Sequence, residues 1–268
     1  MNLRLAKEIL KTAVLGLIVL AILIGGGIWL SQYRNQQPAS CNVAVAQLYG
    51  TLAYYPNEWG NASGTGDQTA SEDIRREIEA ADADPSIKAI LLQVDSAGGD
   101  PVAGEDIATA LRHASKPTVA FIANQGDSSA YWAATGAQTV FASADSSLVD
   151  IGVTQSYLDQ TKQDKQNGLT FIPLTAGQYK DAGNPDSPLT PEEKALFQRD
   201  LNITMQNFIA AVAQNRNLSV ASVTAIADGS SMEGQMALQD GLIDKIGNIY
   251  DVEDYLKGKI GGNVTLCE

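Results

Sequence analysis

The sequence predicts an α/β domain with a mostly parallel sheet, preceded by one transmembrane helix. Two observations predict it: strand–turn–helix units repeat between residues 42 and 142, and residues 12–30 form an uncharged apolar run. Of the 268 residues, 44% are hydrophobic, which allows a sizeable core. The net charge of −13 argues against nucleic acid as a partner, because phosphate binding needs a basic face.

The apolar run at residues 12–30 is long enough to span a bilayer, which takes about 20 residues. Arg4, Lys7 and Lys11 precede it, and Arg34 follows it closely. The positive-inside bias therefore places residues 1–11 in the cytoplasm and the domain outside it, on a single-pass anchor in the cell membrane. A cleaved signal peptide is the alternative. Residues 31–41 are a linker.

The first half of the domain alternates strands and helices. We expect a strand at 42–50, a loop at 56–69 and a helix at 71–81, where Ile74 and Ile78 have helical spacing. A buried strand at 88–95 runs into the tight turn Gly98-Gly99, and a helix at 102–114 follows. Next come a strand at 118–123, a helix at 128–137 and a strand at 139–142.

The second half is less regular. We expect a helix at 158–166, a strand at 169–174 and a polar connection at 176–189. Thr190 and Glu193 form a capping box with Pro191 at the first helical position, which predicts a long helix to about residue 215. Three short helices at 219–228, 234–240 and 249–256 complete the domain.

Ser128 is a candidate nucleophile, because it starts a helix of small residues that can pack closely. The alternative is a simple helix N-cap. The single histidine, His113, lies on a solvated helix end between basic residues, which disfavours a Ser-His-Asp triad. Lys180, on the polar connection, is the candidate base. Its pKa would have to fall from about 10.4 to about 7–8, which burial against a neighbouring element or subunit could achieve.

Gly98 and Gly99 follow a buried strand, so their backbone N–H groups could bind the oxyanion of acyl transfer. An ordinary glycine turn is the alternative. Cys41 and Cys267 lie at the two ends of the domain and could form a disulfide in an oxidising compartment, or remain two unpaired thiols. Two cysteines and one histidine leave little for a metal site, and we expect no cofactor.

Four segments in order resemble the signal peptide peptidase A family, the membrane-anchored, protease IV-like S49 serine peptidases. They are Leu92-Gln93-Val94-Asp95-Ser96-Ala97-Gly98-Gly99, Ser128-Ser129-Ala130-Tyr131-Trp132, Gln178-Tyr179-Lys180-Asp181-Ala182-Gly183-Asn184-Pro185, and the stretch from Ile226 to Gly247. Each segment is weak alone, but four in order with consistent spacing are specific. The resemblance covers residues 42–256 and leaves 257–268 as a tail.

The resemblance implies the crotonase-like β-β-α spiral shared with the Clp protease subunit, in a homo-oligomeric ring anchored to the membrane. Ser128 would be the nucleophile and Lys180 the general base. The backbone at Ser129 and at Gly98 or Gly99 would form the oxyanion hole. Substrates would be signal-peptide remnants and other membrane, misfolded or unfolded polypeptides, hydrolysed through an acyl-enzyme.

The chain departs from the family pattern near this dyad. Ser129 and Ala130 replace two glycines, and Asp150 replaces a serine thought to hydrogen-bond the catalytic lysine. A carboxylate beside Lys180 would raise the pKa of the lysine, so we expect weak activity or an alkaline optimum. A catalytically impaired scaffold that binds membrane proteins is therefore the alternative. A crotonase-type acyl-CoA enzyme is disfavoured by the extracytoplasmic site and by the lysine.

Overall fold

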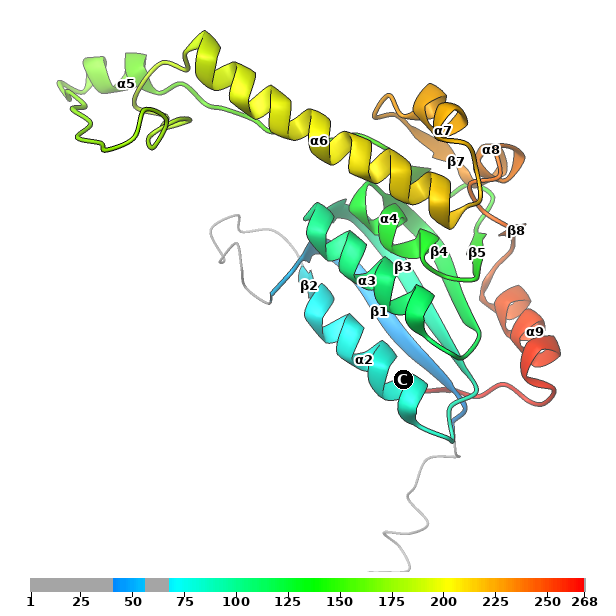
Figure 1. Cartoon of the computed structure of the whole chain (residues 1–268). Coiled ribbons are helices and arrows are strands. Elements are labelled where there is room, and N and C mark those ends of the chain that lie inside the picture. Colours follow the sequence, from blue (N-terminus) through cyan, green and yellow to red (C-terminus); the bar gives the residue numbers. More distant parts are fainter. Residues whose placement is uncertain (1–40, 56–67, 268) are drawn as a thin grey trace, which may run out of the picture. The chain divides into compact units, whose positions relative to one another are not determined.

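The computed structural model describes residues 41–55 and 68–267 (Figure 1). The predicted cytoplasmic N-terminus at 1–11, the predicted anchor at 12–30 and nearly all of the linker lie outside these residues, as does most of the loop at 56–69. Within the described ranges, no helix combines the length and the apolar character needed to cross a membrane.

The described chain confirms the predicted α/β class with a mostly parallel sheet. The main sheet has the order β2-β1-β3-β4-β5-β8, and every neighbouring pair in it is parallel. These strands are β1 (Val43–Ala53), β2 (Gln68–Ala70), β3 (Ala89–Gly99), β4 (Thr118–Asp127), β5 (Thr139–Ala142) and β8 (Lys245–Ile246). The arrangement fits a Clp-protease-like fold.

Strand β4 changes its pairing partner along its length, from β5 to another strand near its C-terminal end. Residues 119–122 pair with β5, whereas residues 125–127 pair with β6 (Ser147–Val149). β6 in turn pairs antiparallel with β7 (Ser231–Glu233). The end of β4 therefore leaves the main sheet and lies beside β6, in register from Asp127 to Val149.

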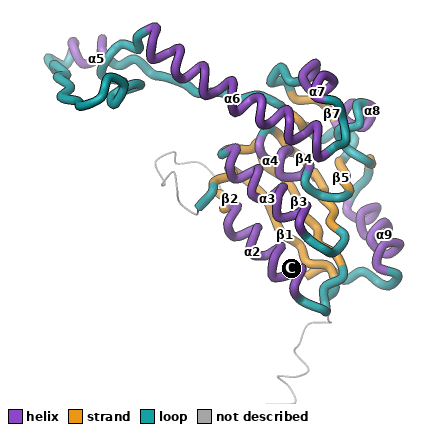
Figure 2. The backbone as a smooth tube through the Cα atoms, in the orientation of Figure 1, coloured by secondary structure: helices purple, strands orange, loops and turns teal. Residues whose placement is uncertain are grey.

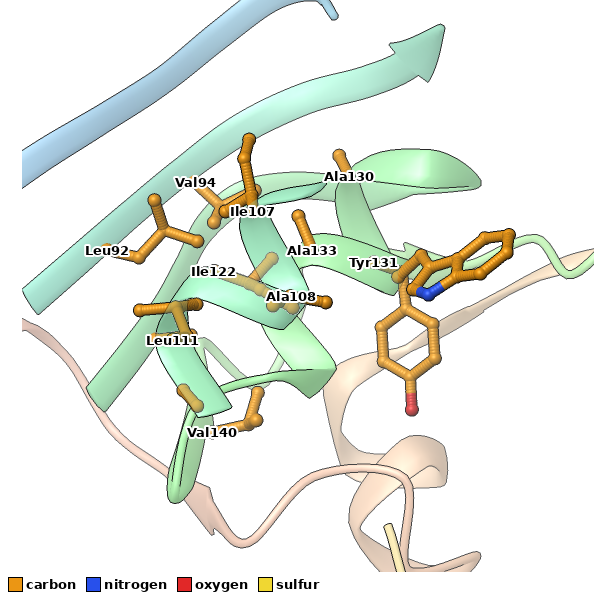
Figure 3. Packing of buried hydrophobic residues seen from close by; sticks show 14 of the residues in the cluster. Leu92, Val94, Ile107, Ala108, Leu111, Ile122, Ala130, Tyr131, Ala133 and Val140 are labelled. Atoms are coloured by element: carbon orange, nitrogen blue, oxygen red, sulfur yellow. The ribbon is translucent and has the colours of Figure 1, made fainter. Parts of the chain in front are cut away.

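The alternation of side chains along β3 separates two cores. Ile90, Leu92 and Val94 face α2 (Ser71–Ala83), α3 (Pro101–His113) and α4 (Ser129–Thr135), which lie side by side over the sheet (Figures 1 and 3). Ala89 and Leu91 instead belong to a second cluster with α9 (Ile249–Ile260). The near-continuous apolar run of this strand is explained by burial on both faces.

A long segment between the two halves of the domain projects away from both cores (Figures 1 and 2). It contains α5 (Thr161–Gln166) and most of α6 (Pro191–Asn215), and no residue from 152 to 207 is buried. We call residues 155–207 the arm. Large apolar side chains lie exposed on it: Leu158, Leu169, Ile172, Leu174 and Ile203.

Several predicted elements differ from the structure. The strand predicted at 169–174 is wrong, because this part of the arm has no neighbouring strand to pair with. The helix predicted at 158–166 begins only at Thr161. Gly98 and Gly99 do not form a separate turn, since β3 continues through Gly99.

The long capped helix is confirmed at Pro191–Asn215, with the predicted capping box formed. The three short helices are confirmed as α7 (Val220–Ile226), α8 (Gly234–Gln239) and α9, which extends to Ile260. Both cysteines are disulfide-bonded. The last strand, β9 (Leu266–Cys267), pairs with the start of β1.

Helices α3 and α4 approach closely because glycines lie at their contacts. A Cβ atom at Gly104 would lie 2.5 Å from the carbonyl oxygen of Ser129, and one at Gly136 would lie 2.3 Å from that of Ala108. Both distances are far below van der Waals contact with backbone atoms, which cannot rotate away. The position of α4, and with it the start of that helix at Ser128, therefore depends on these glycines.

We predict that Gly136→Ala lowers the free energy of unfolding by about 1–3 kcal/mol, because the added methyl group forces α3 and α4 apart. Gly258→Ala in α9 is the matched control, since no atom lies within 4 Å of its Cβ position. The control should be neutral or stabilising by up to about 1 kcal/mol. Urea unfolding of both variants checks this, and equal effects would contradict the packing explanation.

Candidate active site

Ser128 occupies a strained backbone position between β4 and α4. Its φ of 55° and ψ of −128° lie outside the regions that residues with a side chain usually adopt. Its N–H donates a hydrogen bond to the carbonyl oxygen of Val149, at 2.9 Å. Its hydroxyl makes no capping hydrogen bond, so the interpretation of Ser128 as a simple side-chain N-cap is wrong.

A cavity of about 460 Å³ opens beside Ser128. One wall is aromatic: Trp132 of α4 stacks on Phe208 of α6, with ring centroids 4.9 Å apart and planes at 10°. The lining also contains two carboxylates and several backbone segments, but no lysine, arginine or histidine. The cavity residues are Gly99, Pro101, Ser128, Ser129, Trp132, Asp150, Gly152, Val153, Thr154, Phe208, Ala227, Asp228 and Gly229.

The two glycines of β3 have different roles in this geometry. A Cβ atom at Gly98 would lie 2.9 Å from the Cβ of Ser128 and 3.0 Å from the N of Ser129, so only glycine permits this approach. The N–H of Gly98 already donates to the Oγ of Ser96, at 3.0 Å. Gly99 lines the cavity and Gly98 does not.

The side chains that replace the family's glycines are accommodated away from the middle of the cavity. Ala130 is fully buried in the core and does not line the cavity (Figure 3). Ser129 is 2% exposed, and its backbone and Cβ pack where Gly104 lacks a side chain. Its Oγ is buried and has no hydrogen-bond partner among the described residues. The side chains of Ser129 and Ala130 therefore do not fill the cavity.

Asp150 lies at the cavity immediately after Val149, whose carbonyl holds Ser128. Val149 and Asp150 both have positive φ, 87° and 44°, so the chain turns sharply beside the serine. Burial, and then the nearby carboxylate of Asp127, raise the pKa of Asp150. Asp127 is itself buried and accepts hydrogen bonds from Gln125 Nε2 at 2.7 Å and Ser147 Oγ at 3.3 Å.

Lys180 lies on the arm and is not brought to Ser128 within one chain. It is exposed, does not line the cavity and forms no ion pair with another described residue. The expectation that Asp150 neighbours Lys180 is therefore wrong for a single chain, where Asp127 is the charged neighbour instead. Lys180 stays away from Asp150 because the arm that carries it buries none of its residues and does not pack against the rest of the domain.

Three features of the site were not anticipated from the sequence. They are the buried carboxylate of Asp127, the stacked wall of Trp132 and Phe208, and the crossing of Gly152 with Gly229. Asp127 adjoins Ser128 in sequence, and Phe208 lies on the apolar side of the long helix. Ser147, Phe208 and Gly229 come from segments distant from their partners Asp127, Trp132 and Gly152, so no local pattern joins these pairs.

We predict that Asp150→Asn stabilises the fold at neutral pH. Because the folded-state pKa is raised, ionisation of Asp150 costs stability as the pH rises from about 4, the value for an unfolded aspartate. Asparagine stays neutral and tolerates positive φ. Thermal unfolding should show a higher Tm for the variant at pH 7 and no difference below about pH 4.

Asp228→Asn is the control for this comparison. Hydrogen bonds from Ser230 lower the pKa of Asp228, so its ionised form is favoured in the fold. The control should gain no stability at neutral pH. A wild type as stable as Asp150→Asn at every pH would contradict the assigned environment of Asp150.

Comparison with known proteins identifies the family to which the chain is similar. The model of peptidase family S49 matches residues 110–261, more than half of the chain. A protein of Methanocaldococcus jannaschii named Putative protease MJ0651 is 34% identical over 67% of this chain and 58% of its own length. One of Enterococcus faecium named Putative signal peptide peptidase SppA is 27% identical over 71% of this chain and 56% of its own length.

Protease 4 of Salmonella typhi is 28% identical over 82% of this chain, but only 35% of that protein is matched. The chain thus spans little more than half the length of the first two relatives and about a third of the last. The matched family region contains Ser128, Asp150 and Lys180 and reaches into the last helix. On the extent of that match, the chain belongs to peptidase family S49.

Proposed function

We propose that this protein is a membrane-anchored serine endopeptidase that uses Ser128 as nucleophile and Lys180 as general base. The observation that carries the proposal is the conformation of Ser128. It is a strained serine that lines a cavity, its hydroxyl makes no capping hydrogen bond, and its N–H donates to the carbonyl oxygen of Val149. Strain that the surroundings hold in place is typical of functional positions.

The chemistry follows from the groups at the cavity. Ser128 Oγ attacks the carbonyl carbon of the peptide bond while its proton passes to the neutral amine of Lys180. The N–H groups of Ser129 and Gly99 stabilise the oxyanion, because Gly98 has its N–H bonded to Ser96. The lysine then protonates the leaving amine. Water, deprotonated by the same lysine, releases the acyl group from Ser128.

The base reaches the serine from a second copy of the chain. Among the described residues, no cationic side chain lines the cavity, and Lys180 is exposed on the arm. The arm has no buried residue, yet it exposes Leu158, Ile172 and Leu174. Apolar surface of this extent is typical of an interface. A head-to-tail contact that repeats and closes gives a ring, in which each cavity receives the arm of its neighbour.

Polypeptides are the proposed substrates, in particular signal-peptide remnants and other membrane or unfolded segments. The names of the relatives, one a signal peptide peptidase and others proteases, support this class. An aromatic wall beside the serine suits an apolar side chain. The uncharged run at residues 12–30 supports an anchor in the cell membrane with the catalytic domain outside the cytoplasm.

A scaffold without activity is the second candidate function. The observation that favours it is the lack of a lysine or histidine among the described residues that line the cavity of one chain, together with the carboxylate at Asp150. Such a protein would keep the assembly and bind membrane proteins at the same surfaces. Hydrolysis assays on assembled protein separate the two candidates.

We predict that Ser128→Ala and Lys180→Ala each lower peptide hydrolysis at least about a thousandfold, because each removes one half of the dyad. When the two variants are unfolded and refolded together in equal amounts, activity should return to about a quarter of wild type, since random pairing completes a quarter of the sites.

The two separate variants, mixed after assembly, serve as the control and should stay inactive unless copies exchange. Failure of co-refolded protein to regain activity, when wild type treated in the same way is active, would contradict a base supplied by a second copy. A wild type that assembles but hydrolyses no casein or peptide across about pH 6–10 would favour the scaffold.

A further inference from the structure

Four sites in the sequence carry the motif Asn-x-Ser/Thr, whose asparagine accepts N-linked oligosaccharides in proteins exported from the cytoplasm. They begin at Asn61, Asn202, Asn217 and Asn263. Asn61 lies outside the described residues, and the other three lie within them. The motif is short and also occurs by chance, so conformation and exposure decide which asparagine can be modified.

The first described motif lies inside a helix. Asn202 is in the middle of α6, and its Oδ1 accepts a hydrogen bond from Gln198 Nε2 at 3.0 Å. Residues two apart on a helix do not face each other, so Asn202 and Thr204 are not presented together. The hydroxyl of Thr204 also donates back to the carbonyl oxygen of Asp200, at 3.2 Å. Modification of Asn202 would therefore require α6 to unfold locally.

The second motif joins two helices, and its hydroxyl is already in use. Asn217 is exposed, with a φ of 54°, just after α6. Ser219 is the N-cap of α7, and its Oγ accepts the N–H of Ser222 at 3.0 Å. Between them, the N–H of Leu218 donates to the carbonyl oxygen of Ala213 at 2.8 Å. Recognition of this motif would disrupt the cap of α7.

The third motif is in an open segment. Residues 263–265 lie between α9 and β9 in neither helix nor strand, and both Asn263 and Thr265 are exposed. Within the described chain, the side chains of these two residues make no hydrogen bond. A Cβ atom at Gly261 or Gly262 would meet nothing within 4 Å, so the approach to Asn263 is unobstructed.

The backbone of this third motif is held by Asn42, at the start of the domain. Asn42 Nδ2 donates to the carbonyl oxygen of Asn263 at 2.8 Å, and Asn42 Oδ1 accepts the N–H of Thr265 at 2.9 Å. The carbonyl oxygen of Thr265 accepts the N–H of Asn42, also at 2.9 Å. Because only backbone atoms of the motif are used, both of its recognised side chains stay exposed on a fixed backbone.

We infer that Asn263 is an acceptor for an N-linked oligosaccharide. The inference rests on the proposed location of the domain outside the cytoplasm, and not on the proposed peptidase activity. The disulfide between Cys41 and Cys267, the second residue after Thr265, supports an oxidising compartment of this kind.

The donor is an oligosaccharide joined through phosphate to a membrane lipid, and a membrane-bound transferase is the catalyst. The amide nitrogen of Asn263 forms a bond to the anomeric carbon of the first sugar and gives up one proton to a base of the transferase. The bond from that carbon to the phosphate oxygen breaks, and the lipid phosphate leaves with the electron pair. The transfer needs no oxidant or reductant.

The acceptor lies at the opposite end of the sheet from Ser128. β9 pairs with β1 at Val43, whereas Leu52 of β1 pairs with Gly99, which lines the cavity. At about 3.3 Å per residue, β1 separates these two ends by roughly 30 Å. An oligosaccharide on Asn263 therefore leaves the cavity uncovered.

The experiment uses full-length protein purified from the membranes of the organism that encodes it. Free thiols are alkylated, and the protein is digested with trypsin without reduction. Cleavage after Lys259 gives the peptide 260–268, which contains both Asn263 and Cys267. Tandem mass spectrometry should find a series of sugars on Asn263 in most copies, with this peptide disulfide-linked to the one that contains Cys41.

Variants produced in the same organism separate the motif from the fold. Asn263→Gln should lose the sugars and still fold, because Asn42 bonds only to the backbone here. Thr265→Ala should lose them although Asn263 is present, and Thr265→Ser should keep them. Asn217→Gln is the matched control and should leave the modification of Asn263 unchanged.

The results that would overturn the inference are distinct from those that bear on the proposed function. Unmodified Asn263 in disulfide-bonded protein would refute the acceptor and leave the location standing. Unmodified Asn263 with both cysteines alkylated would refute the acceptor and the location together. Sugars on Asn202 or Asn217 alone, or sugars that persist in Thr265→Ala, would also refute it. Peptide hydrolysis is assayed separately, so failure of the proposed peptidase affects none of these results.

Discussion

The hydrogen bond from Ser128 N–H to the carbonyl of Val149 is the constraint on which the site depends. It joins the end of β4 to the end of β6 and holds Ser128 at positive φ, where the residue lines the cavity and its hydroxyl does not cap α4. The bond is possible only because β4 pairs with β5 along residues 119–122 but with β6 along residues 125–127. Close helix packing through Gly104 and close strand approach at Gly98 keep the turn in place.

This construction separates Ser128 from Lys180, the nucleophile and the base of our proposal. Ser128 belongs to the rigid part of the domain, where two cores cover the sheet. Lys180 belongs to the arm, which buries none of its residues. In our proposal a single chain carries half of a catalytic site, and burial of the arm's apolar side chains against another copy completes it. Under this proposal assembly controls activity, because Lys180 of an isolated chain does not line the cavity beside its own Ser128.

The sequence predicts those parts of the structure that are set locally. Alternating apolar strands, the Thr190–Glu193 capping box and the helical spacing of Ile74 and Ile78 give correct elements, because each depends on neighbours along the chain. The arm is mispredicted at 169–174, because an apolar run predicts a strand only when a partner strand exists. The environment of Asp150 is also missed, because it depends on residues distant in the sequence. Its charged neighbour is Asp127 at the end of β4, whereas Lys180 lies exposed on the arm.

The central claim, that Ser128 is the reactive residue, is tested most directly by covalent labelling. Assembled wild-type protein is treated with a fluorophosphonate probe, and the modified peptide is identified by mass spectrometry. The label should be found on Ser128, stay absent from Ser129 and be lost in Lys180→Ala. Well-folded, assembled wild-type protein that takes up no label, or takes it up equally without Lys180, would contradict the account.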